Sequence, residues 1–150
     1  MSKACAVPID QTLFVRDHCL CLATRRAARA MSRLFDEAFR PIGITNGQFS
    51  LLHALNRPAP PSVQAVADLL AMDRTTLTAN LKPLERDGLV EIAADAVDRR
   101  IRRLGLTAAG EAALARAMPV WIATHDRIDA DLAAVAVDAA QLRSGLAVLA

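Results

Sequence analysis

The sequence has few aromatic side chains, which make up 3% of its 150 residues and include no tyrosine. Alanine is the commonest residue instead, with 31 copies. A core of alanine and leucine packs as helices, so a large β-sandwich is disfavoured. The hydrophobic fraction of 53% is high enough to form a core and excludes an intrinsically disordered chain. We therefore expect a mainly α-helical protein.

Long apolar runs are also missing, since no stretch reaches the ~18 residues that a membrane-spanning helix needs. Residues 1–5 lack the apolar core of a signal peptide. Three cysteines, Cys5, Cys19 and Cys21, are a poor basis for a disulfide framework. These absences predict a cytoplasmic protein with reduced thiols and no membrane partner.

Enzyme motifs are absent as well. The sequence contains no glycine-rich phosphate loop, no nucleophile elbow and no paired metal-ligand motif. His18, Cys19 and Cys21 lie close together, but their spacing is not that of a zinc site. We therefore expect no catalytic activity, no cofactor and no bound metal.

Helical periodicity accounts for most of the chain. It runs from Leu13 to Phe39, after a loose arm of residues 1–12, and Pro41 and Gly43 end it. Three shorter helices are expected next, because each apolar pattern follows a residue that can accept hydrogen bonds from the first helical turn. These caps are Thr45, Ser62 and Asp73, and Gly88 is expected to end the last of the three helices.

The pattern then changes to that of a β-hairpin. Residues 89–94 and 101–107 are strand-like and flank a polar tip, residues 95–100. A long helix is expected after Thr107, and Pro119 should kink or split it. A last helix should follow Asp138. Residues at heptad spacing predict a packing seam along the long helix; they are Leu114, Met118, Trp121, His125, Ile128 and Leu132.

This order of elements predicts an α+β winged helix, with a helix-turn-helix and a hairpin wing in residues 45–107. The helix after Asp73 should bury one leucine face and turn a small, hydroxylated and basic face outward. Such a face can approach base edges and reach guanine or phosphate, although an ordinary solvated helix can have the same composition. Its residues are Thr75, Thr78, Ala79, Lys82 and Arg86.

Arginine supplies 16 of the 18 basic residues, and four arginines fall at the hairpin. Arg99 and Arg100 are expected at its tip, where they can enter a minor groove. Asp98 can hold one guanidinium through paired hydrogen bonds. A hairpin charged only for solubility is the alternative, and it is less favoured directly after a helix-turn-helix.

Two motifs occur in this order. The first is Asp73-Arg74-Thr75-Thr76-Leu77-Thr78, which continues into residues 84–90. The second is Asp98-Arg99-Arg100, which is followed by residues 104–110. Together they resemble the MarR family of winged helix-turn-helix transcriptional regulators. The resemblance covers about residues 15–150. The sequence departs from it at Pro83, which should bend the reading helix near Ala79 and alter the direction of Lys82 and Arg86.

The resemblance implies a homodimer that binds pseudo-palindromic double-stranded DNA near promoters, with repression as the expected outcome. It adds Arg74 and Thr76 to the DNA-binding residues. It also implies that Arg100 enters the minor groove while Asp98 orients it and Arg99 lies beside it.

Dimerisation helices are expected from both chain ends, residues 13–40 and 108–150, around the DNA-binding lobe 45–107. The peripheral helices carry more apolar positions than a monomer of this size can bury, which favours an obligate dimer. The residues expected at the interface are Met31, Leu114, Trp121, Ile128, Leu142, Leu146 and Leu149.

The resemblance further implies relief by a small aromatic or phenolic effector, but no spacing identifies the residues that would bind it. A cysteine-based redox switch at Cys19 or Cys21 is one alternative. Two residues apart on a helix, these thiols point about 200° away from each other, so a disulfide between them is disfavoured. A winged-helix module that binds proteins and no DNA is the other alternative.

Overall fold

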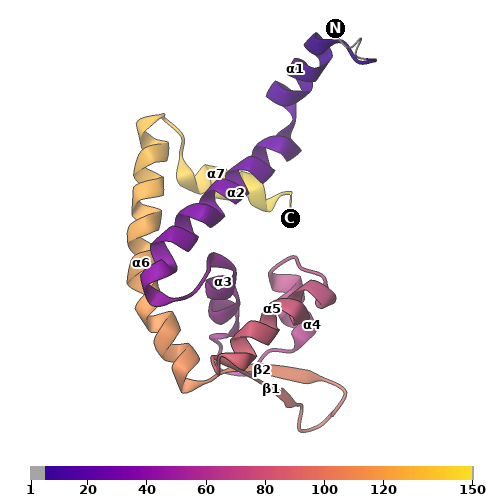
Figure 1. The fold of residues 1–150 in the computed structure, drawn as a ribbon, viewed down its shortest axis with the longest axis vertical. Helices are drawn as coiled ribbons and strands as arrows, with labels where there is room; N and C mark the ends of the chain where they lie inside the picture. The colour runs from indigo at the N-terminus through magenta and orange to yellow at the C-terminus, as the bar shows by residue number, and fades with distance from the viewer. Residues whose placement is uncertain (1–5, 150) are drawn as a thin grey trace, which may run out of the picture. The chain divides into compact units, whose positions relative to one another are not determined.

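The structure is a computed structural model that describes residues 6–149, and helices predominate in it (Figure 1). The chain divides into two compact units after Leu34. The first unit holds α1 (Ile9–His18) and most of α2 (Leu20–Phe39), and the second holds all later elements. A single two-stranded antiparallel sheet accompanies the helices in the described residues, which confirms the predicted mainly α, winged-helix class.

The first helical region differs from the prediction. We expected one helix from Leu13, but α1 already begins at Ile9 and α2 is a separate helix after Cys19. The backbone of Cys19 is extended, with φ −78° and ψ 104°, and its Sγ accepts a hydrogen bond from the Leu22 N–H at 3.4 Å. Apolar periodicity continues across this position, so the pattern does not reveal the break.

Three helices of the second unit begin at the predicted caps. The Thr45 hydroxyl accepts from the Gln48 N–H at 3.2 Å, and the Gln48 side chain accepts from the Thr45 N–H at 2.9 Å. Ser62 and Asp73 each cap the helix that follows them. The elements are η1 (Arg40–Ile42), α3 (Asn46–Leu55), α4 (Val63–Leu69) and α5 (Arg74–Arg86).

The hairpin consists of β1 (Val90–Ala94) and β2 (Arg102–Leu106), paired so that Val90 faces Leu106 and Ala94 faces Arg102. The segment before α4 extends this sheet. Ser62 forms a β-bridge with Arg103, and the Leu104 N–H donates to the Pro61 carbonyl at 2.9 Å. The hairpin is therefore attached through β2 to the start of the helix-turn-helix.

The long helix α6 (Ala108–Ala134) continues through Pro119, so the predicted split does not occur. Proline removes one backbone hydrogen bond, and packing of the helix on both sides of it outweighs that loss. α6 contacts α3, η1 and β2 along its length, and α7 (Ala139–Ala147) packs back against it after the Asp138 cap.

One threonine joins the end of α5, the end of the hairpin and the start of α6. The Thr107 hydroxyl donates to the Gly88 carbonyl at 2.6 Å and accepts from the Gly110 N–H at 3.1 Å. The Thr107 N–H donates to the Leu89 carbonyl at 3.2 Å. Gly88 has φ +70°, which a glycine adopts without strain and which directs the chain from α5 into β1.

The core of the second unit lies between α3, α4, α5, the hairpin and α6. Its largest fully buried side chains are Phe39, Leu51, Leu52, Leu77, Leu81, Leu84, Leu104 and Val66. An aromatic cluster borders it. Phe49 stacks on Phe39 with ring centroids 4.9 Å apart, and His125 lies 4.2 Å from Trp121 and 5.0 Å from Phe35.

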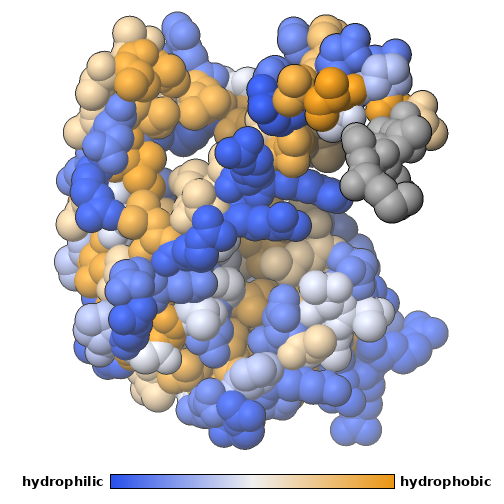
Figure 2. All heavy atoms as spheres, turned by 45° about the horizontal axis from the view of Figure 1, so that its top comes forward, coloured by the Kyte–Doolittle hydropathy of each residue, from blue (hydrophilic) through white to orange (hydrophobic). Residues whose placement is uncertain are grey.

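Apolar side chains also remain on the surface (Figure 2). In the second unit, Val135, Leu142, Leu146 and Leu149 are between 41% and 69% exposed. The lower right of the same view is hydrophilic instead. At the hairpin tip the Arg100 side chain is 91% exposed, next to an exposed Val97. The surface therefore has apolar positions on α7 and charged ones at the wing.

Candidate nucleic-acid interface

The helix-turn-helix consists of α4, a tight turn and α5. In the turn, Ala71 has φ +50°, and the Met72 N–H donates to the Ala67 carbonyl at 2.9 Å. Asp73 then caps α5 by accepting from the Thr76 N–H at 2.8 Å and the Thr76 hydroxyl at 2.6 Å. These bonds, first the one from the hydroxyl, hold the pKa of Asp73 below its usual value.

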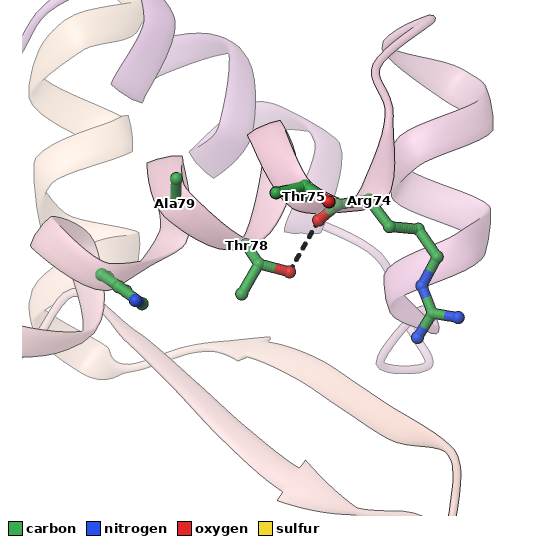
Figure 3. Close-up of a pocket in the computed structure, with 5 residues that line it drawn as sticks. Arg74, Thr75, Thr78 and Ala79 are labelled. Atoms are coloured by element: carbon green, nitrogen blue, oxygen red, sulfur yellow. Dashed lines mark hydrogen bonds between the residues drawn. The ribbon is translucent and has the colours of Figure 1, made fainter.

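α5 has the two faces that the sequence predicts. Leu77, Leu81 and Leu84 are at most 1% exposed and fix the helix on the core. The opposite face is a shallow hollow lined by Arg74, Thr75, Thr78, Ala79 and Lys82 (Figure 3). A helix held by one face and presenting small side chains on the other fits the requirement for entering a major groove.

Individual side chains on this face differ in what they already bind. The Thr78 hydroxyl donates to the Arg74 carbonyl at 2.7 Å, and the Arg74 side chain extends away from the start of the helix (Figure 3). Arg86 pairs with Asp87, with 2.9 Å between Nε and Oδ1. The Thr76 hydroxyl is engaged by Asp73. Thr76 and Arg86 therefore have structural partners, whereas Thr75 and Lys82 make no side-chain hydrogen bond within residues 6–149.

The hairpin tip has the expected aspartate–arginine pair. Asp98 accepts from the Arg100 guanidinium twice, at 3.1 Å from both Nε and Nη2, and from the Arg100 backbone N–H at 3.0 Å. The Arg100 side chain is 91% exposed. The guanidinium, more than the backbone bond, lowers the pKa of Asp98 below its usual value.

A second acid–base pair, which the sequence analysis missed, lies behind the tip. Asp95 accepts from the backbone N–H of Val97 and of Asp98 and from Arg103. The bond from Asp98, then those from Arg103 and Val97, lower the pKa of Asp95 to about 2. The pair joins positions eight residues apart, which only the strand register brings together.

The starts of α4 and α5 and the wing border a groove of about 230 Å³. It is lined by Ser62, Gln64, Arg74, Arg100 and Arg102, with Val63 and Ile101 beside them. Three arginines and no acidic residue line this groove, although the Arg100 guanidinium is already paired with Asp98. A groove bordered by arginines suits a phosphate. Arg102 and Gln64 were not among the predicted site residues.

The predicted dimerisation residues have different environments. Leu114 is 5% exposed and belongs to the core of the second unit, so it is not available to a partner in this conformation. Trp121 and Ile128 are partly buried against the same core. Met31, Leu142, Leu146 and Leu149 are 40% to 62% exposed.

Cys19 is half-buried and Cys21 is exposed, and both are free thiols, whereas Cys5 lies outside the described residues. No group of three metal-ligating side chains occurs in residues 6–149. No helix in the described part of the chain is long and apolar enough to cross a membrane.

Fold and site together define a winged helix-turn-helix protein of the DNA-binding kind. Residues 42–101 match the family model described as MarR family. The crystal structure of the transcriptional regulator MosR from M. tuberculosis in complex with DNA is 40% identical, over 88% of this chain and 93% of that one, with a TM-score of 0.78. The chain belongs to the MarR family of transcriptional regulators.

Two further relatives extend the comparison. The transcriptional repressor CouR, bound to a 23-mer DNA duplex, is 29% identical over 90% of this chain and 92% of that chain, with a TM-score of 0.73. The transcriptional activatory protein BadR from Rhodopseudomonas palustris is 33% identical over 88 residues, which are 57% of this chain and 50% of BadR. The chain spans about half the length of the curated relatives it matches. These relatives are regulators of transcription and not enzymes.

Proposed function

We propose that this protein acts as a homodimer that binds a pseudo-palindromic DNA duplex and represses transcription until a small aromatic or phenolic effector releases it. In each subunit α5 enters the major groove and the wing enters the adjacent minor groove. The observation that carries the proposal is the pairing of two features on one lobe: the small, basic outer face of α5 and the exposed Arg100 oriented by Asp98.

The DNA contacts divide into two kinds. Thr75, Thr78, Ala79 and Lys82 contact base edges, and their common position in the outer hollow of α5 supports this assignment. Arg74, Arg99, Arg100 and Arg102 supply positive charge to the backbone and the minor groove. The structural partners of Thr76 and Arg86 give these two residues a supporting part in the interface.

The homodimer is supported by the exposed leucines of α7, since a solvent-exposed leucine row on a terminal helix is a typical interface feature. Repression is supported by the similarity to CouR, a transcriptional repressor, whereas BadR is a transcriptional activatory protein. A transcription assay on the recovered operator, with and without the protein, decides between repression and activation.

The experiment for DNA binding is selection of duplexes from a random pool, followed by a salt titration of affinity for the selected duplex. Arg100→Ala should weaken binding to all sequences nearly alike and make the salt slope shallower by up to about one unit per subunit. Arg127→Ala, which removes the same charge from an exposed position on α6, is the matched control and should leave the slope unchanged. Failure to recover any duplex would favour a protein-interaction module instead.

The effector can be tested by fluorescence, because Trp121 is the only tryptophan in the chain. Phenolic acids are titrated against the protein and then against its complex with the selected duplex. An effector should change the Trp121 emission and lower DNA affinity over the same concentration range. Ligands that do neither are excluded.

A further inference from the structure

The wing contains a set of hydrogen bonds that leads from the body of the lobe to Arg100. We propose that Asp95 and Arg103 are positioning residues that fix the direction of Arg100, and that Arg103 itself makes no DNA contact. This inference rests on the proposed function, because it gives the wing pairs a part in DNA binding.

The two carboxylate oxygens of Asp95 have separate partners. Oδ1 accepts from the backbone N–H of Val97 at 2.9 Å and from that of Asp98 at 3.0 Å. Oδ2 accepts from Nε of Arg103 at 2.6 Å. One oxygen therefore shapes the tip, and the other ties it to β2.

Arg103 is placed to anchor this arrangement. Its backbone lies in β2 opposite Ala93 and forms a bridge with Ser62. Its Nη1 donates to the Pro60 carbonyl at 3.4 Å. Its side chain is 40% exposed against 91% for Arg100, so the two arginines face different surroundings. Arg103 thus connects the tip to the segment that leads into α4.

The bonds continue from Asp95 to Arg100 through Asp98. Asp95 holds the backbone N–H of Asp98, and the Asp98 carboxylate holds the Arg100 guanidinium by two bonds and the Arg100 N–H by a third. The tip is closed further by the Ile101 N–H, which donates to the Asp98 carbonyl at 2.9 Å, and by the Asp95 N–H, which donates to the Ile101 carbonyl at 2.9 Å. Both ends of the turn are therefore fixed around the aspartate that orients Arg100.

Orientation before binding affects affinity because an exposed arginine has many rotamers, and ordering it on DNA opposes association. Loss of the anchor should leave Arg100 present but less ordered. Ordering one such side chain changes affinity by roughly 2- to 12-fold, so this is the effect expected for a broken Asp95–Arg103 link.

Asp95→Asn separates the two tasks of the carboxylate. The asparagine oxygen can still accept from Val97 and Asp98, whereas its NH₂ group cannot accept from Arg103. Arg103→Met breaks the same link from the other side, because methionine has a similar length but no group that can donate to Asp95. Asp129→Asn is the matched control, because Asp129 pairs with the exposed Arg143 of α7 at 3.2 Å and has no link to the wing.

The decisive measurement is a double-mutant cycle with Arg100→Ala, using the duplex selected by the parent protein. Asp95→Asn and Arg103→Met should each weaken binding roughly 2- to 12-fold for each wing in the parent background, which is roughly 5- to 150-fold for a dimer that binds through two wings. Neither should weaken it further when Arg100 is already alanine. Asp129→Asn should have no effect in either background, and thermal unfolding should show that all variants are folded.

Three outcomes would overturn the inference; the first two leave the proposed function in place, and the third also removes its wing contact. Asp95→Asn could weaken binding equally with and without Arg100, which would make Arg103 or Asp95 an independent contact. Asp95→Asn and Arg103→Met could leave affinity unchanged. Arg100→Ala could itself have no effect, which would leave nothing to position. If the parent protein selects no duplex at all, the proposed function fails first.

Discussion

At Gly110 the structure predicts that a change to alanine destabilises the protein, which is the opposite of what helix propensity predicts. Gly110 is the third residue of α6, and replacing glycine by alanine in a helix ordinarily stabilises a protein by about 1 kcal/mol. A Cβ at this position would lie 2.0 Å from the Leu89 carbonyl oxygen and 3.0 Å from its carbon. Real Cβ atoms essentially never approach other atoms below 3.0 Å, so the backbone must move.

The movement would separate elements that the Leu89 carbonyl holds together. That carbonyl accepts from the Thr107 N–H, and Thr107 caps α6. Forcing an additional carbon into a close-packed site costs about 1–3 kcal/mol, and a clash with backbone at 2.0 Å belongs at the upper end of that range. After the propensity gain of about 1 kcal/mol is subtracted, we expect Gly110→Ala to lower the free energy of unfolding by about 2 kcal/mol.

Gly47→Ala is the matched control. Gly47 is the second residue of α3, and a Cβ there would meet only the Thr45 hydroxyl oxygen, at 3.9 Å. The free energy of unfolding of the Gly47→Ala variant should equal that of the parent or exceed it by up to about 1 kcal/mol. Urea unfolding at one protein concentration measures both variants, with equal m-values as the sign that only stability has changed. A Gly110→Ala protein as stable as the parent would refute the steric reasoning.

Three further predictions concern assembly, protonation and thiols. Sedimentation at micromolar concentration should give twice the chain mass of 16.1 kDa. A Leu142→Glu, Leu146→Glu variant should shift the measured mass toward that of the monomer. A parent protein that stays a folded monomer would exclude the dimer. The Asp95 carboxyl should titrate near pH 2 by NMR. Arg103→Ala should raise that pKa without restoring the ordinary value of 3.8, because the two backbone N–H bonds remain. Since the pKa is lower in the folded state, the stabilisation from this group is present above pH 3.8 and is lost as the pH falls toward 2. If thiol oxidation regulates the protein, peroxide should release DNA from the parent but not from a Cys19→Ser, Cys21→Ser variant, and equal release from both would exclude these thiols.

Local features of the fold were predictable from the sequence because the interactions that set them span only a few residues. The side chains of the caps Thr45, Ser62 and Asp73 bind backbone groups three residues further on, and the sequence pattern correctly predicted all three. The sequence pattern did not predict the break at Cys19, because a single extended residue leaves the apolar periodicity intact. Continuity of α6 through Pro119 depends on packing that no local pattern shows.

The residues of the candidate site also divide into those that local patterns predict and those that require the three-dimensional structure. The outer face of α5 follows from helical geometry, and the Asp98–Arg100 pair follows from its short spacing. The heptad pattern correctly marked Leu114 as a packing residue but did not reveal that its partners lie in the same chain. Asp95 and Arg103 required the register of the hairpin, which fixes cross-strand neighbours only once the turn is known.

The junction at Thr107 has a mechanical consequence. Its bonds to Gly88, Leu89 and Gly110 join the end of α5, both ends of the wing and the start of α6 at one point. Such a point is a rigid corner and not a hinge, because bending it would break several hydrogen bonds in a packed site. A displacement of the start of α6 must therefore carry α5 and the wing with it as one body.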